Sequence, residues 1–324
     1  MTGRVLLLAT GDVMAYARHT GRPGLALAAD LLAAVPGDLG VEVVTEDVQA
    51  EPSWDTSPST MLRLARRARS ALLNEGFDGV VVTHGLDTIE ETAFLADLLA
   101  GPAALRGGIV LTGAVRGLDE LSSDGPRNLA SSLVAAADPA LRGAGAVVCV
   151  NDELHAARWV TMTDATGVAA MSSAPAPILG RVVDGRAELT AVPPPRPPAA
   201  RGEPETHVAL VKTYPEMDPV LLTSVVDAGA RGIVLEGTGA GNVPITLYAT
   251  ISELTEWDIP VVVASRCRTR PVPLDDLPLG LGLAQWKVGA VGARGLTAVK
   301  ARYALMVALG GGGRRAVRDW FAGL

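Results

Sequence analysis

The stretch GVVVTHGLDTIEET, residues 79–92, joins the pattern of a buried strand to the pattern of a helix start. Its valines predict a strand covered on both faces, and the acidic residues from Asp87 onward are typical of a first helical turn. In α/β proteins such a turn lies at the carboxyl end of a parallel strand, where ligands bind. We therefore expect a ligand site here. Leu86 is unusual in it, because a branched apolar side chain stands among polar residues.

The same alternation extends over the first part of the chain. Ala- and Leu-rich segments of helical periodicity, such as residues 60–76, separate short apolar runs. This pattern predicts a parallel sheet with helices on both faces, in a larger N-terminal domain over residues 1–192. The apolar runs are residues 4–11, 41–47, 79–85, 108–114 and 146–152.

A proline-rich stretch, residues 193–206, interrupts the alternation, and its composition predicts a semi-rigid linker. Apolar runs then resume at residues 208–215, 232–242 and 259–267, followed by a helical segment. We therefore expect a smaller C-terminal α/β domain over residues 207–324. The predicted fold class is α/β, with two domains.

Charge and hydropathy exclude several classes of partner. The net charge is −7, and the densest basic stretch, residues 63–70, has the spacing of a solvated helix face, so we expect no nucleic-acid partner. No apolar stretch approaches the roughly 20 residues of a membrane span. The N-terminal apolar run lacks a clear cleavage site and predicts a first strand rather than a signal peptide.

The histidines and cysteines predict neither a metal nor a cofactor. The four histidines and two cysteines show no spacing typical of metal ligands. Cys149 and Cys267 both lie in apolar runs, which favours buried free thiols in a reducing cytoplasm over a disulfide.

Several longer motifs occur together and in a fixed order, and they resemble the bacterial-type L-asparaginases over nearly the whole chain. The resemblance implies a large N-terminal and a smaller C-terminal domain. It also implies a homodimer or homotetramer in which each active site lies between the N-terminal domain of one subunit and the C-terminal domain of its neighbour. The motifs are LLLATGDVMA (6–15), VVVTHGLDTIEETAFLADLL (80–99), LTGAVRGLDELSSDGPRNLASSLVAA (111–136), VNDELHAARWVTMTDAT (150–166) and GARGIVLEGTGAGNVP (229–244).

The residues that the resemblance implies for catalysis are replaced. That family hydrolyses a side-chain amide with a threonine nucleophile, while a second threonine, a lysine and an aspartate move protons. The nucleophile falls on Val13, the second threonine on Leu86 and the lysine on Met162. None of these side chains can act as a nucleophile, acid or base. We expect them instead to line an apolar pocket.

The residues that the resemblance implies for substrate binding are partly kept. Asp87 matches the carboxylate that holds the substrate's amino group, and Ser53 matches the serine that holds its carboxylate. Trp54 replaces a glutamine, and Ala240 replaces an asparagine supplied by the neighbouring subunit, although Asn242 remains. The predicted substrate-binding residues are Ser53, Trp54, Leu86, Asp87, Val13 and Met162.

Three other residues are candidate catalytic groups. Asp12 occupies a glycine position of the family's first turn, where the alternative role is to cap the following helix. Tyr16 and His19 lie with Arg18 in residues 14–24, which match the family's lid. A lid histidine can serve as an acid or base, and the alternative is an idle exposed side chain.

Each of several other polar residues has two possible roles, one functional and one structural. Asp87 and Glu90 have the spacing of a capping box as well as of a ligand anchor. Thr83 and His84 are expected to satisfy backbone groups behind the turn, and Asp124 to hold a turn that supports the site. The hydroxyls of three threonines are candidates to replace the lost nucleophile, and the alternative is that they are bonded to the backbone. These are Thr10, Thr161 and Thr163.

Three functions remain open from the sequence. The first is a diverged enzyme that acts on a larger, more apolar amino-acid- or amide-containing small molecule in specialised metabolism. The second is a non-catalytic binding or partner protein, and the third is an amidohydrolase that uses a substitute hydroxyl. The first function is favoured, because the substrate-binding residues Ser53 and Asp87 are kept while the catalytic residues around them are replaced by apolar ones.

Overall fold

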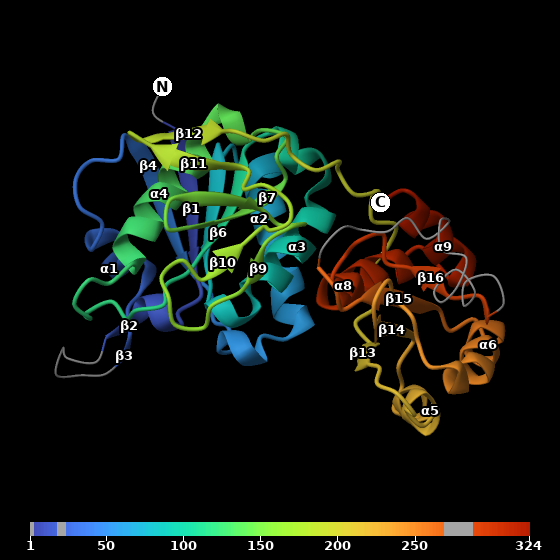
Figure 1. The fold of residues 1–324 in the computed structure, drawn as a ribbon. Coiled ribbons are helices and arrows are strands. Elements are labelled where there is room, and N and C mark those ends of the chain that lie inside the picture. The colour runs from blue at the N-terminus through green and yellow to red at the C-terminus, as the bar shows by residue number, and fades with distance from the viewer. Residues whose placement is uncertain (1–2, 18–23, 269–287) are drawn as a thin grey trace. The chain divides into compact units, whose positions relative to one another are not determined.

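The computed structural model describes residues 3–17, 24–268 and 288–324, and it divides the chain into two compact units, residues 1–195 and 196–324 (Figure 1). The boundary falls within the proline-rich stretch. Both units are built of strands and helices, so the predicted two-domain α/β fold is confirmed.

The first unit contains an eight-stranded sheet with the order β12-β11-β8-β7-β6-β5-β1-β4. The five strands from β4 to β7 are parallel to one another. The sheet strands are β1 (Gly3–Ala9), β4 (Val41–Asp47), β5 (Gly79–Thr83), β6 (Gly108–Thr112), β7 (Ala146–Val150), β8 (Glu153–Ala156), β11 (Gly180–Val183) and β12 (Arg186–Leu189).

The sheet departs from the predicted parallel sheet at one edge, where β8, β11 and β12 run antiparallel. The reversal occurs between β7 and β8, at Asn151 and Asp152, whose φ angles are 51° and 60°. Two consecutive residues with positive φ make the tight turn that joins antiparallel strands, and Asn and Asp tolerate this conformation best after glycine. The sheet is therefore mixed.

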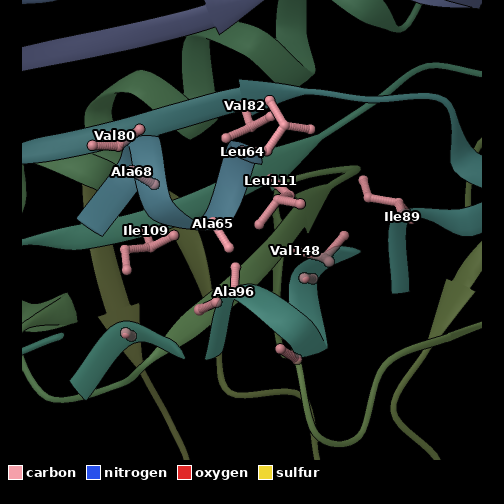
Figure 2. Packing of buried hydrophobic residues seen from close by; sticks show 14 of the residues in the cluster. Leu64, Ala65, Ala68, Val80, Val82, Ile89, Ala96, Ile109, Leu111 and Val148 are labelled. Carbon is pink, nitrogen blue, oxygen red and sulfur yellow. The ribbon is translucent and has the colours of Figure 1, made fainter. Parts of the chain in front are cut away.

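Helices cover both faces of this sheet, as the continuous apolar strands predict. Alternate residues of the central strands point to opposite faces, so Leu6, Val80 and Leu111 join one core cluster and Val5, Val81 and Val110 join the other. The cluster beneath α2 and α3 is shown in Figure 2. The helices are α1 (Ala28–Ala33), α2 (Pro58–Asn74), α3 (Ile89–Ala100) and α4 (Gly125–Ala137).

Short elements fill the loops of the first unit. Two small antiparallel pairs are β2 (Tyr16–Ala17) with β3 (Gly24–Leu25), and β9 (Thr161–Met162) with β10 (Met171–Ser172). The 3-10 helices are η1 (Val13–Ala15), η2 (Ser53–Asp55), η3 (Leu86–Thr88), η4 (Gly101–Leu105) and η5 (Pro139–Leu141).

The second unit has a parallel four-stranded sheet with the order β13-β14-β15-β16. Its core includes Leu235, Ile251 and Val263. The strands are β13 (Val208–Lys212), β14 (Gly232–Gly237), β15 (Val261–Ser265) and β16 (Val291–Gly292), and the helices are α5 (Val220–Asp227), η6 (Ile245–Leu247), α6 (Tyr248–Glu256), α8 (Ala298–Leu309) and α9 (Arg314–Ala322).

The two cysteines differ in environment. Both are free thiols, as predicted, and Cys149 is buried in β7. The prediction that Cys267 is also buried was wrong, because the chain has left β15 by this residue and its side chain is exposed. Within the described ranges, no helix combines the length and hydropathy needed to cross a membrane.

Candidate functional site

Three turns meet at one edge of the first unit's sheet. They follow β1, β4 and β5, which are neighbours in the sheet, and they contain η1, η2 and η3 respectively. Because these strands are parallel, their carboxyl ends and the turns after them lie at the same edge. The predicted site residues Asp12, Ser53 and Asp87 are thereby brought together.

Ser53 connects the three turns. Its main-chain N–H donates to Oδ2 of Asp12 at 2.7 Å, and its hydroxyl donates to Oδ2 of Asp87 at 3.3 Å. Its carbonyl oxygen accepts from Oγ1 of Thr88 at 2.5 Å. Ser53 is only 2% exposed, so these bonds are largely shielded from water. Ser53 therefore fixes the relative positions of η1, η2 and η3 through its N–H, its hydroxyl and its carbonyl oxygen.

Asp12 is held in an unusual backbone conformation. Its φ of 70° and ψ of −163° lie in a region adopted almost only by glycine, which costs a residue with a side chain about 1–3 kcal/mol. Oδ1 of its carboxylate accepts from the N–H of Val13 at 2.7 Å, while Oδ2 accepts from Ser53. Asp12 is thus the N-cap of η1, which is the structural alternative expected from the sequence. The catalytic role of Asp12 stays a prediction.

Gly85 is required where the first and third turns approach each other. A Cβ at this position would lie 2.1 Å from the Ser53 hydroxyl oxygen and 2.3 Å from Oδ2 of Asp12. No side chain fits at those distances. The glycine therefore allows the carboxylate of Asp12 to lie against the main chain of the third turn.

Asp87 presents a carboxylate at the surface of the site. Its side chain is exposed, and among the residues that the structure describes Ser53 is its one hydrogen-bond partner. The capping-box alternative was wrong, because the N-cap of α3 is Thr88 and Glu90 instead accepts from the hydroxyl of Thr161 at 2.6 Å. An exposed carboxylate with a single hydroxyl donor can accept an ammonium group from a ligand.

The apolar replacements occupy two different environments. Leu86 is 7% exposed and belongs to the core cluster that contains Leu6, Val80 and Leu111, and the partly buried Met162 packs against the same cluster. A Cβ at Gly113 would lie 2.7 Å from Cδ2 of Leu86, so this leucine packs directly on the main chain after β6. In contrast, Val13 is 36% exposed and Trp54 is 69% exposed. Leu86 and Met162 therefore contribute to the same hydrophobic cluster, whereas Val13 and Trp54 lie at the surface.

His84 and Thr83 satisfy groups around the turns, as expected from the sequence, and Oγ1 of Thr83 accepts from the N–H of Thr10 at 3.1 Å. Nδ1 of His84 lies 2.7 Å from the carbonyl oxygen of Gly85, and Nε2 lies 2.9 Å from Oγ1 of Thr92. Because a carbonyl only accepts, Nδ1 carries the proton and Nε2 accepts from the hydroxyl. Burial lowers the pKa of His84, so the ring is neutral near pH 7.

The other candidate hydroxyls are engaged in local bonds. Thr10 donates to the carbonyl oxygen of Thr83 at 2.7 Å, and Thr163 donates to that of Ala170 at 3.4 Å. Thr161 is different, because its hydroxyl donates to a carboxylate, that of Glu90. No residue pattern indicates this pair, because the two residues are 71 positions apart.

Asp124 holds the turn after β6, as predicted. Its two carboxylate oxygens accept from the N–H groups of Val115 at 3.1 Å and Arg116 at 2.9 Å. Asn128, which the sequence analysis did not single out, donates to Asp124 at 3.2 Å and to the carbonyl oxygen of Gly113 at 2.9 Å. This network supports the main chain on which Leu86 packs.

Parts of the predicted site lie elsewhere or are not described. Tyr16 is exposed in β2, whereas Arg18 and His19 lie outside the described residues. Ala240 and Asn242 belong to the second unit, in a turn where the N–H of Thr238 donates to the carbonyl oxygen of Asn242 at 2.8 Å. In the described ranges, no group of three or more His, Cys, Asp or Glu side chains is placed to hold a metal ion.

Comparisons with known proteins agree with this architecture. Residues 4–194 match the family model "Asparaginase, N-terminal", and residues 207–321 match "Glutaminase/Asparaginase C-terminal domain". A probable L-asparaginase of Deinococcus radiodurans is 34% identical over 319 residues, covering 96% of this chain and 94% of that protein. L-asparaginase 2 of Escherichia coli is 31% identical over 272 residues, covering 79% of this chain and 73% of that protein.

A solved structure has the same fold. The crystal structure of a probable cytoplasmic L-asparaginase from Campylobacter jejuni superimposes with a TM-score of 0.84 at 28% identity, over 99% of this chain and 100% of that chain.

Proposed function

The chain belongs to the asparaginase family, and we propose that it is a diverged member that has lost ordinary asparagine hydrolysis. It binds an amino-acid- or amide-containing small molecule that is larger and more apolar than asparagine. The observation that carries the proposal is the Ser53–Asp87 pair, in which a buried serine holds an exposed carboxylate beside apolar side chains.

The retained anchor supports binding of an amine. Asp87 offers an exposed carboxylate whose orientation is restrained by the Ser53 hydroxyl. A charge-assisted bond between a ligand ammonium and this carboxylate is stronger than a bond between neutral groups. Val13 and Trp54 are exposed on the turns that carry Asp12 and Ser53, so they offer apolar surface to the rest of the ligand.

The core position of Leu86 argues against the family's usual chemistry. Hydrolysis through a hydroxyl needs a nucleophile and a base within hydrogen-bonding reach. Val13 and Met162 cannot supply either group, and Leu86 is committed to the packing of the sheet. Among the remaining groups, we propose that Asp12, Tyr16 and His19 carry whatever chemistry the site performs.

A non-catalytic binding or partner protein is the second candidate. It is favoured by the geometry of Asp12, because both of its carboxylate oxygens already accept main-chain N–H groups, which is the arrangement of a structural cap. The third candidate is an amidohydrolase with a substitute hydroxyl. The Thr161–Glu90 pair favours it, because a carboxylate 2.6 Å away can accept the proton of that hydroxyl.

Membership of the family supports a proposal for the setting of the site. We propose a cytoplasmic homodimer or homotetramer, with a small-molecule ligand, in which the turn around Ala240 and Asn242 of a neighbouring subunit completes the site. Because the pocket differs from that of the family, we also propose a role in specialised metabolism. Light scattering that finds a stable monomer at micromolar concentration would contradict this assembly.

The first test is ammonia release from the purified protein supplied with asparagine or glutamine. We expect turnover about 10⁴- to 10⁶-fold below that of an intact asparaginase site. A rate constant of about 1 s⁻¹ or more, which is within the usual range of enzymes, would overturn the proposal and favour a substitute hydroxyl.

The second test is calorimetric binding of a library of amino acids and amides with large apolar side chains, followed by mass spectrometry of the mixture. We expect Asp87→Asn to abolish binding, while Asp55→Asn, a change of an exposed carboxylate in the same site region, leaves it unchanged. Asp12→Asn is expected to retain binding and stop conversion. Binding without conversion by the unaltered protein would establish the non-catalytic candidate.

A further inference from the structure

A cavity of about 150 Å³ lies within the second unit, far along the chain from the site described above. It is formed where the segment after Pro195 passes the end of α8 and the helix α9. Its lining includes Pro198, Arg201, Ala308, Ala316, Asp319 and Trp320. None of these residues matches a motif that the sequence analysis assigned to the family's active site.

Trp320, which lines this cavity, carries an unsatisfied hydrogen-bond donor. The residue is 6% exposed, and its indole Nε1 is the buried side-chain nitrogen or oxygen that lacks a hydrogen-bond partner among the described residues. Its ring packs edge-on against Phe321, with the centroids 5.5 Å apart. A buried donor without an acceptor is costly and rare in folded proteins. A ligand acceptor that reaches this N–H would remove the cost.

Two opposite charges border the same cavity. Arg201 and Asp319 both line it, and both side chains are exposed. Within the part of the chain that the structure describes, neither has an ion pair or a side-chain hydrogen bond, with the other or with a third residue. A ligand with a single charge would satisfy one of these groups and be opposed by the other. A zwitterion satisfies both.

The remaining walls limit the size of the ligand. Pro198, Ala308 and Ala316 contribute short apolar surfaces. A cavity of about 150 Å³ accommodates a molecule the size of benzene. The volume therefore suits a compact head group with a short apolar side chain rather than a nucleotide or a peptide.

We propose that this cavity binds a small free amino acid. The carboxylate of the ligand accepts from the Trp320 N–H and from the guanidinium of Arg201. Its ammonium group donates to Asp319, and its side chain contacts Ala308, Ala316 and Pro198. The inference is independent of the proposed function, because the two sites use different residues of different units.

The test is isothermal titration with alanine, valine and leucine as probes, carried out on the full chain with the Asp87→Asn change so that the first site cannot contribute. Each probe is paired with its N-acetyl form, which lacks the positive charge, and its amide form, which lacks the negative charge. We expect saturable binding of at least one free amino acid with a Kd of about 1 mM or below. We expect each blocked form to bind about tenfold more weakly or not at all.

Three variants locate the binding. Trp320→Phe keeps the ring and removes the N–H, Arg201→Gln and Asp319→Asn remove one charge each, and every one should weaken binding about tenfold. Arg318→Gln is the matched control, because this exposed arginine lies on α9 but does not line the cavity, and it should bind as the parent does. The two charge variants alter exposed side chains, so they keep the test valid if Trp320→Phe unfolds.

Several results would overturn the proposal. They are the absence of saturable binding for all three amino acids, equal binding of a free amino acid and its N-acetyl or amide form, and equal binding by the parent, Arg201→Gln and Asp319→Asn. Failure here leaves the proposed function intact, because that function is tested by ligands lost on Asp87→Asn.

Discussion

The main-chain N–H of Ser53 donates to the carboxylate of Asp12 at 2.7 Å, across 41 positions of sequence. This bond joins the turn after β1 to the turn after β4 and compensates for the unfavourable backbone of Asp12. The carboxylate at position 12 is therefore first a structural group, whatever chemistry it performs.

Replacing Asp12 by Asn should lower stability. An amide can offer its oxygen to only one of the two N–H groups that Asp12 now accepts, and its own NH₂ would face the other. We expect a loss of about 1–3 kcal/mol, measured as a lower midpoint of urea unfolding. Asp55→Asn, an exposed change in η2, should leave the midpoint unchanged. An equal midpoint for both variants would contradict the structural role of Asp12.

Leu86→Ala should destabilise the first unit much more than Val13→Ala. Leu86 is buried in the core cluster, so its truncation leaves a cavity and costs about 2–4 kcal/mol. Val13 is 36% exposed, and its truncation should change stability by less than about 0.5 kcal/mol. Equilibrium denaturation of the two variants gives the comparison. Similar losses would mean that Leu86 does not contribute to the core as described.

Restoring the three family residues together should raise asparagine hydrolysis. The combined change Val13→Thr, Leu86→Thr and Met162→Lys supplies a nucleophile and a proton-transfer group beside the retained Asp87. We expect ammonia release to rise about 10²-fold or more above the parent for the triple variant, and to stay at background for each single change. Adding Asp87→Asn to the triple variant should remove the gain. Appreciable activity in a single variant would point to a different nucleophile.

Stability should fall on acidification below neutral pH because of His155. Burial, together with the positive charge of Arg181, lowers the pKa of this histidine from 6.5 to about 4 in the folded state. Above pH 6.5 the folded and unfolded forms are both neutral, and no stability is lost. Between about pH 6.5 and pH 4, His155 is protonated in the unfolded form but stays neutral in the folded form. The free energy of unfolding therefore declines by about 3 kcal/mol in total.

The measurement is the unfolding midpoint between pH 4 and pH 7 for the parent and for His155→Gln. The variant should show a smaller decline with falling pH, even if its midpoint is lower throughout. His207→Gln, which removes an exposed imidazole paired with Glu205, should keep the decline that His155→Gln loses. A parent-like decline in His155→Gln would assign the acid sensitivity to other groups.

A thiol reagent should modify only one of the two cysteines in the folded protein. Cys267 is exposed, whereas Cys149 is buried and burial raises its pKa to about 12, so it has almost no thiolate near pH 8. We expect Cys267→Ser to abolish fast labelling and Cys149→Ser to leave it unchanged. Labelling of both residues in the folded protein would contradict the prediction, because it would show that β7 becomes accessible to the reagent without unfolding.

The sequence predicts the fold well because the central strands are uniformly apolar. The β-branched run GVVVT, for example, predicts a strand with both faces covered, and it is β5. The antiparallel edge depends on the turn at Asn151 and Asp152, which stand at the end of the apolar run 146–152 and were assigned to that run rather than to a turn. A dipeptide of turn-forming residues between two strand patterns was the signal that could have found it.

The site is less predictable than the fold. Asp12, Ser53 and Asp87 were identified from the sequence, and the structure brings them together. The role of Ser53 rests on its main-chain N–H and carbonyl, which every residue possesses, so no side-chain pattern reveals it. Leu86 was expected to line a pocket, yet it packs on Gly113, because the distance between η3 and the main chain after β6 is set by tertiary packing.

Every bond that Ser53 makes to the other two turns is non-local, with sequence separations of 41, 34 and 35 positions. Contacts of this kind form only after the chain between them has been closed into loops, and pairing of parallel strands is slow for the same reason. During folding, the two carboxylates therefore take up their relative positions only once β4, β1 and β5 have paired. A partly folded chain has no ligand site to offer, and ligand binding at Asp87 becomes a kinetic marker for completion of the sheet.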